Sequence, residues 1–190
     1  MISLPLANEW SVELPYDIHE HQHRFAAWAA ASAAATIRRP FRVKTGVAWL
    51  VSVGLNAELR IQQLPTTESD FDEWHREMRQ RLVEASQSRL THGQAAKLIN
   101  CYLKARFINI FSTELKSTRV AHPPIDALLL LDILHANLLT GDDECIIRDL
   151  QMAGWSNWSS DRYEQAIDIL RSIDRTQPFW MIEKHWVGYR

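Results

Sequence analysis

The chain has 190 residues, of which 46% are hydrophobic and 23% charged, a composition typical of one soluble globular domain with a sizeable core. Its net charge of −2 argues against a dedicated nucleic-acid binder, because such proteins are usually basic overall, although a local basic surface remains compatible with it. Two cysteines, Cys101 and Cys145, are too few for a disulfide framework or a zinc site, and neither a signal peptide nor a membrane-spanning stretch is evident, so we expect a cytoplasmic protein.

The first third of the chain predicts helices after an irregular start. Residues 1–16 are predicted to form an irregular N-terminal arm, and residues 17–190 a single all-α domain. The helix predicted at 17–36 is rich in alanine, which allows helices to pack closely. The pattern at 43–53 predicts a second helix, although its β-branched residues would also suit a strand. Residues 56–69 are predicted to form a loop.

The strongest amphipathic pattern begins at a cap, Ser69 or Asp70, and continues to about Ser86. Its apolar stripe repeats at three- and four-residue steps, through Phe71, Trp74, Met78, Leu82 and Ala85. A further helix is predicted at 92–107, followed by a connection at 108–121.

The last third predicts a buried helix and three shorter ones. Residues 124–139 are apolar nearly all round, which predicts a fully buried helix that ends at Gly141. Shorter helices are predicted at 144–152, 159–173 and 178–186. The whole pattern predicts an all-α domain of about eight helices.

Lys97 lies on the polar face of the helix predicted at 92–107. On a helical projection Lys97, Asn100 and Lys104 share one face, opposite the apolar residues Leu98, Ile99, Tyr102, Leu103 and Phe107. A face of this kind usually keeps lysines in water. If it lined a cleft instead, removal from water would favour the neutral amine and allow nucleophilic chemistry.

Asp126 follows Pro123-Pro124 at the start of the apolar helix. The ordinary interpretation places the two prolines in the first turn, where Asp126 would complement the positive end of the helix dipole. The functional interpretation is that the rigid helix holds an ionised carboxylate at the edge of a cleft. An amine on one helix and a carboxylate at the start of the next could then act together.

The two motifs together resemble the helix-hairpin-helix DNA glycosylase superfamily, and most closely its 8-oxoguanine glycosylase branches. The resemblance covers about Thr91–Leu131: Gly-x-x-x-Lys opens one helix, and Pro-x-Asp opens a buried helix 29 residues after the lysine. It implies that Lys97 is the nucleophile that attacks the sugar C1′ and forms a Schiff base. It also implies that Asp126 stabilises the cationic sugar. The hairpin carries one glycine where the family usually has two, and no cysteine motif for an iron–sulfur cluster is present.

A glycosylase also needs contacts to the DNA strand and an aromatic slot for the extruded base. The strand contacts predicted on this basis are His92, Gly93, Gln94, Lys104 and Arg119, with Gly93 at a helix N-terminus that could bind a phosphate. A wider basic track would add Arg38, Arg39, Arg42, Lys44, Arg106 and Lys116. Among the eight tryptophans, base stacking is predicted for Trp155, Trp158 and Trp180, with Trp186 as a further candidate, although most tryptophans are expected in the core.

A second hypothesis is a non-catalytic helical subunit of a bacterial multi-protein system. The tryptophan-rich C-terminus, Phe179–Trp186, would then anchor a protein partner, because aromatic residues dominate interface hot spots. Under the first hypothesis the partner is DNA that contains a modified base; no membrane partner and no cofactor is expected under either. His19 and His23 are spaced to share a metal ion on a helix face, but no third ligand is apparent, so no metal site is predicted.

Overall fold

The computed structural model describes residues 16–35, 41–110 and 115–188, and within these ranges it is all-α and contains no strand. Its α-helices are α1 (Ile18–Ala34), α2 (Val43–Ser52), α3 (Glu68–Ala85), α4 (His92–Leu103), α5 (Lys116–Val120), α6 (Ala127–His135), α7 (Gly141–Ala153) and α8 (Ser160–Ser172). Short 3-10 helices are η1 (Ile61–Gln63), η3 (Trp155–Asn157) and η4 (Phe179–His185), and a π-helical turn, η2 (Lys104–Ile108), continues α4. The predicted all-α class is confirmed. The predicted arm lies outside the described residues except for Tyr16.

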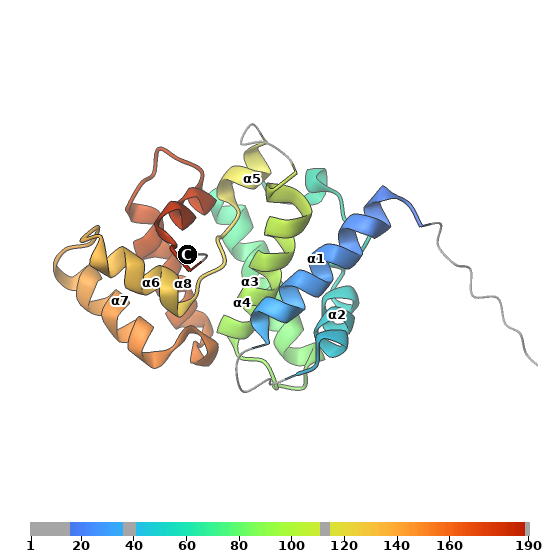
Figure 1. Ribbon diagram of the computed structural model, residues 1–190, viewed down its shortest axis with the longest axis horizontal. Helices are drawn as coiled ribbons and strands as arrows, with labels where there is room; N and C mark the ends of the chain where they lie inside the picture. Colours follow the sequence, from blue (N-terminus) through green and yellow to red (C-terminus); the bar gives the residue numbers. More distant parts are fainter. Residues whose placement is uncertain (1–15, 36–40, 111–114, 189–190) are drawn as a thin grey trace, which may run out of the picture.

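The helices form two halves of one domain. In Figure 1, α1–α4 lie together on one side and α6–α8 on the other, with α5 between them at one edge. Each half has its own apolar cluster, centred on residues such as Leu50 and Phe71 in the first half and Leu130 and Ile167 in the second. Helix α4 contributes to both clusters, since Leu98 packs in the first and Ala96 in the second. Any site on α4 therefore lies where the two halves meet.

Alanine lets α1 approach α4 closely, as the sequence predicts. Its inner face consists of Ala26, Ala27, Ala30, Ala31 and Ala34, all completely buried. Its outer face carries Phe25 and Trp28, which are exposed. No helix of the described chain is long and apolar enough to cross a membrane.

Two helix starts differ from the prediction because of their caps. Helix α3 begins at Glu68, since the Thr67 hydroxyl accepts from the Asp70 amide at 3.2 Å, two to three residues before the predicted cap. Asp126 is the N-cap of α6 rather than a first-turn residue, and its Oδ1 accepts from the Leu129 amide at 2.9 Å. Pro123 and Pro124 therefore precede the helix.

Three further predictions, all for the chain after α4, are corrected by the structure. Helix α5 lies within the region predicted as a connection. Helix α6 is not fully buried, because Leu128 is 49% exposed. Gly141 does not end α6 but begins α7, with a φ of +60° that glycine adopts without strain.

Candidate functional site

Lys97 and Asp126 meet where the two halves of the domain join. Helix α4 is buried on nearly all sides, so its predicted solvent face is covered by the second half of the fold. The Lys97 Nζ lies 3.0 Å from Asp126 Oδ2, and the Lys97 side chain is only 8% exposed. The indole of Trp155 completes the surroundings, with its centroid 5.6 Å from the same Nζ. The amine and the carboxylate thus form a preorganised pair.

The pair lines a cavity of about 410 Å³. The α1 side of the cavity consists of Phe25, Ala29 and Ala33, and the small side chains of the two alanines leave the space open. The opposite side includes Trp186 and Pro124. This volume lies within the range of small-molecule sites, roughly 300–1,000 Å³, and would hold a nucleobase.

A second ion pair lies in the same cavity. The Lys104 Nζ donates to Glu183 Oε1 at 2.7 Å, and both residues line the space. Burial raises the pKa of Glu183 above its ordinary value, although Lys104 opposes the shift. Burial also raises the pKa of the Cys101 thiol, another lining residue, to about 11, which keeps it protonated and unreactive at neutral pH. Cys101 is therefore a poor candidate nucleophile.

The predicted phosphate site at the start of α4 is already occupied by protein. The Gly93 amide donates to the Trp158 carbonyl at 3.2 Å, and the Gln94 amide donates to the Thr91 hydroxyl at 3.2 Å in a capping box. Both residues are buried, while His92 is partly exposed. Neither the Gly93 nor the Gln94 amide is free to bind a phosphate in this conformation.

Gly93 is required for this close packing of α4 on η3. A Cβ at this position would lie 1.8 Å from the Trp155 carbonyl oxygen, a backbone atom that can move only with its segment. We expect Gly93→Ala to lower the free energy of unfolding by roughly 1–3 kcal/mol, as overpacking does elsewhere. Urea denaturation would measure it, with Met152→Ala, at an exposed position on α7, as the control. Equal stability of the two variants would contradict the expectation.

The tryptophans predicted to stack on a base divide into two groups. Trp158 is a core residue, only 1% exposed, and its Nε1 donates to the Leu150 carbonyl at 3.0 Å, so it has no free ring face for a base. Trp155 and Trp186 are partly exposed, and they lie beside Lys97 and in the cavity wall respectively. Trp180 is also partly exposed but is not among the cavity residues. The prediction for Trp158 is thus corrected.

The predicted basic track is not continuous. Arg106 is buried, and its guanidinium donates to the carbonyl oxygens of His19 at 2.6 Å and Ala57 at 3.0 Å, so it ties the start of α1 to the loop before η1. Arg119 is exposed and donates to the Thr176 carbonyl at 3.3 Å. Three further residues, Arg42, Lys44 and Lys116, are exposed, whereas Arg38 and Arg39 lie outside the described residues.

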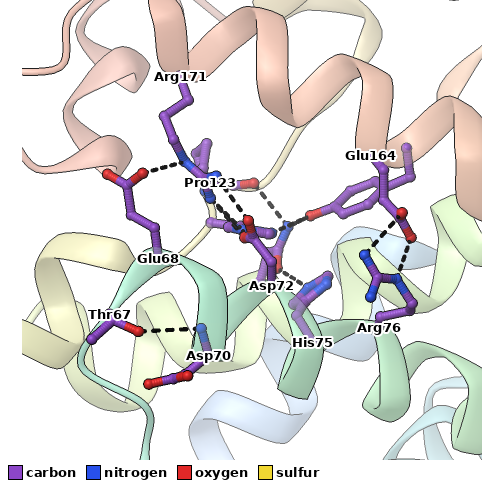
Figure 2. A network of polar contacts seen from close by, with 12 residues as sticks. Thr67, Glu68, Asp70, Asp72, His75, Arg76, Pro123, Glu164 and Arg171 are labelled. Atoms are coloured by element: carbon purple, nitrogen blue, oxygen red, sulfur yellow. Dashed lines mark hydrogen bonds and ion pairs between the residues drawn. The ribbon is translucent and has the colours of Figure 1, made fainter.

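A buried polar network connects the two halves behind the Lys97–Asp126 pair (Figure 2). The His75 Nε2 contacts Asn100 Oδ1 at 2.8 Å, and the Asn100 amide group donates to the Pro123 carbonyl at 2.9 Å and to the Tyr163 hydroxyl at 3.0 Å. The Tyr163 hydroxyl also contacts His122 Nδ1 at 3.0 Å. These residues come from α3, α4, α8 and the segment before α6.

The network continues to an ion pair between the halves. The Arg171 guanidinium donates to both oxygens of Asp72, at 2.7 and 2.8 Å, and His122 Nε2 lies 2.7 Å from Asp72 Oδ1. Since Asp72 can only accept, His122 carries its proton on Nε2, and Nδ1 accepts from Tyr163. Burial alone would raise the pKa of Asp72, but hydrogen bonds from Arg171 and His122 outweigh it and hold that pKa well below its ordinary value.

The sequence contains one signal for this network. His75 falls in the apolar stripe of α3, between Phe71 and Met78 at helical spacing, and is completely buried. A polar residue at such a position requires a buried partner. Tyr163 is also buried, and its polar partners come from segments distant in the sequence.

The side chain of His23 and the backbone of His19 make contacts within the fold. His23 Nδ1 contacts the Tyr102 hydroxyl at 3.0 Å, and the carbonyl of His19 accepts from Arg106. Over the described ranges, no group of three or more histidine, cysteine or acidic residues could hold a metal ion.

The segment predicted to anchor a partner protein packs largely against its own chain. Phe179 and Ile182 are buried, and Trp186 packs on the cluster of the second half. Comparisons with protein-family models, curated proteins and solved structures gave no match.

Proposed function

We propose that the protein is a DNA glycosylase of the helix-hairpin-helix type that removes a damaged or modified base. The observation that carries the proposal is the Lys97–Asp126 pair at 3.0 Å on the wall of a 410 Å³ cavity. Each of the two residues is indicated by its own sequence motif, and they are 29 positions apart in the chain. Their contact is the geometry that such an enzyme requires.

The proposed reaction uses both residues directly. Lys97 gives up a proton, for which Asp126 is the nearest acceptor, and its amine attacks the sugar C1′. The bond between C1′ and the base breaks, and the base leaves with the bonding electrons and takes up the proton held by Asp126, which is then a carboxylate again. The C1′–O4′ bond opens next, O4′ takes up one proton from the attached nitrogen, and the C–N bond becomes the C=N bond of a protonated Schiff base. Positive charge develops on the sugar as the base leaves, and the Asp126 carboxylate stabilises it.

DNA contacts are proposed at exposed basic residues rather than at the hairpin amides. Lys104 lines the cavity, and Arg119 is exposed on α5. A bound base would lie near Trp155 or Trp186, since both indoles are close to the lysine or the cavity.

Trapping with borohydride tests the proposal. The protein is incubated with a DNA duplex that contains 8-oxoguanine, and with a panel of duplexes that carry other modified bases. Borohydride reduces a Schiff base to a stable covalent adduct, which is then visible as a shifted band. We expect an adduct with at least one duplex and its loss in Lys97→Gln.

The matched control is Lys184→Gln, because Lys184 is exposed and its nearest acid, Asp174, lies 3.7 Å away. This variant should form the adduct as the wild type does. The proposal is wrong if no duplex in the panel gives base release or an adduct. It is also wrong if Lys97→Gln, shown to be folded by circular dichroism, forms the adduct at the wild-type rate.

A further inference from the structure

Asn100 links the two elements that carry the residues of the candidate site. It is on α4, one turn after Lys97, and is completely buried. Its amide group donates to the carbonyl of Pro123, three residues before Asp126, at 2.9 Å. One side chain thus joins the helix that carries the amine to the segment that carries the carboxylate.

The segment before Asp126 has few backbone hydrogen bonds of its own, although the His122 side chain contacts Asp72 and Tyr163. Residues 121–125 are all buried and precede the helix, so they lack the helical ladder of hydrogen bonds. Pro123 and Pro124 have no amide N–H to donate. A buried carbonyl such as that of Pro123 needs a partner, and Asn100 supplies it.

The orientation of the Asn100 amide is fixed by its other contacts. Its Oδ1 faces His75 Nε2, and its second N–H donates to the Tyr163 hydroxyl. The side chain uses both N–H groups and its oxygen, so it cannot rotate without breaking several hydrogen bonds. An amide on a short side chain is required, since aspartate lacks the donors and leucine lacks all polar atoms.

We infer that Asn100 is a positioning residue: it holds the Pro123–Asp126 segment against α4 and so sets the Lys97–Asp126 contact. The catalytic meaning of this inference rests on the proposed function, whereas the positioning itself does not. Loss of the Pro123 contact would let the segment move away from α4. Lys97 would then be less firmly paired and more open to solvent.

The test measures the reactivity of the Lys97 amine in the folded protein. The free protein is methylated with formaldehyde and a mild hydride donor, and mass spectrometry follows each lysine, with exposed Lys184 as the internal reference. The variants are Asn100→Leu and, as a smaller change, Asn100→Ser. Tyr163→Phe is the matched control, because it removes a network hydroxyl but leaves the Asn100–Pro123 hydrogen bond in place.

We expect Lys97 to react slowly in the wild type and in Tyr163→Phe. In Asn100→Leu we expect its methylation rate, relative to Lys184, to rise several-fold, and in Asn100→Ser by a smaller factor. If Asn100→Leu does not fold, Asn100→Ser decides the outcome. An unchanged Lys97 rate in the folded variants overturns the inference, as does an equal rise in Tyr163→Phe, which would indicate general loosening.

Adduct formation with DNA separates this inference from the proposed function. If the wild type forms an adduct, the Asn100 variants should form it more slowly, with a single-turnover rate lowered by up to roughly 10²-fold, because a small displacement of a catalytic group can have an effect of this size. The DNA concentration that gives half-saturation should stay unchanged. A loss of DNA affinity alone would overturn the role in catalysis. If the wild type forms no adduct but Lys97 reactivity still depends on Asn100, the proposed function fails and the positioning role stands.

Discussion

Arg171→Leu should lower the free energy of unfolding by about 3–5 kcal/mol, as does the removal of one partner from a buried ion pair elsewhere. The Arg171 side chain is only 9% exposed, and it donates two hydrogen bonds to Asp72 across the two halves of the domain. Leucine would leave the Asp72 carboxylate with His122 as its remaining close donor. Urea denaturation at pH 7 measures the change.

A surface ion pair provides the control for this prediction. Arg76 makes a similar two-fold contact with Glu164, at 2.9 and 3.1 Å, but its side chain is half exposed. We expect Arg76→Leu to cost less than about 1 kcal/mol, because water and side-chain entropy offset most of an exposed pair. Similar costs for the two variants would contradict the view that Arg171 and Asp72 join the halves as a buried pair.

The sequence predicts the helices well where one face alone is buried. The stripe that includes Phe71, Met78 and Leu82 identifies α3, and the inward residues Tyr163 and Ile167 identify α8. In both, a single apolar face packs on the core and the other faces water, so the period of 3.6 residues is visible.

Helix α4 shows where this reasoning fails. Lys97 and Asn100 form a polar face in the sequence, which is typical of contact with water. In the structure that face is covered by the second half of the domain, so both residues are buried. Periodicity distinguishes apolar from polar faces, but it does not reveal that a polar face is itself an internal contact.

The prediction for the segment before α6 is wrong for a different reason. Proline is compatible both with the first turn of a helix and with extended chain, since both allow its fixed φ. The hydrogen bond from Asn100 to the Pro123 carbonyl and the cap formed by Asp126 accompany the extended form. The partners of these bonds lie on another helix or follow from the position of the cap, so local sequence could not decide between the two forms.

The stability of the protein should fall as the pH drops from 7 to 5, and His122 should account for a defined part of the loss. Burial lowers the pKa of His122 to about 4, although Asp72 opposes the shift, and burial also lowers the pKa of His75 well below its ordinary value. His122 is surrounded by Asp72, His75 and Arg79 from α3 and by Tyr163 and Arg171 from α8.

The direction of this change in stability with pH follows from proton binding in the folded and unfolded states. An unfolded histidine takes up a proton near pH 6.5, whereas folded His122 stays neutral until about pH 4. Between these values the unfolded state binds more protons, so lowering the pH favours unfolding. From pH 7 to pH 5 the expected loss is roughly 2 kcal/mol for each such histidine. Below the ordinary pKa of its carboxyl group, protonation of Asp72 adds to the loss.

Comparison of two variants isolates the part due to His122. Asparagine cannot titrate, so His122→Asn should reduce the loss of unfolding free energy between pH 7 and pH 5 by roughly 2 kcal/mol, although the variant is less stable at pH 7. Ile167→Val, a buried substitution on α8 that removes no titratable group, should leave the pH dependence as in the wild type. Urea denaturation at closely spaced pH values gives both slopes. If His122→Asn retains the wild-type slope, His122 takes up its proton at the same pH in the folded and unfolded states, which would contradict the lowered pKa of folded His122.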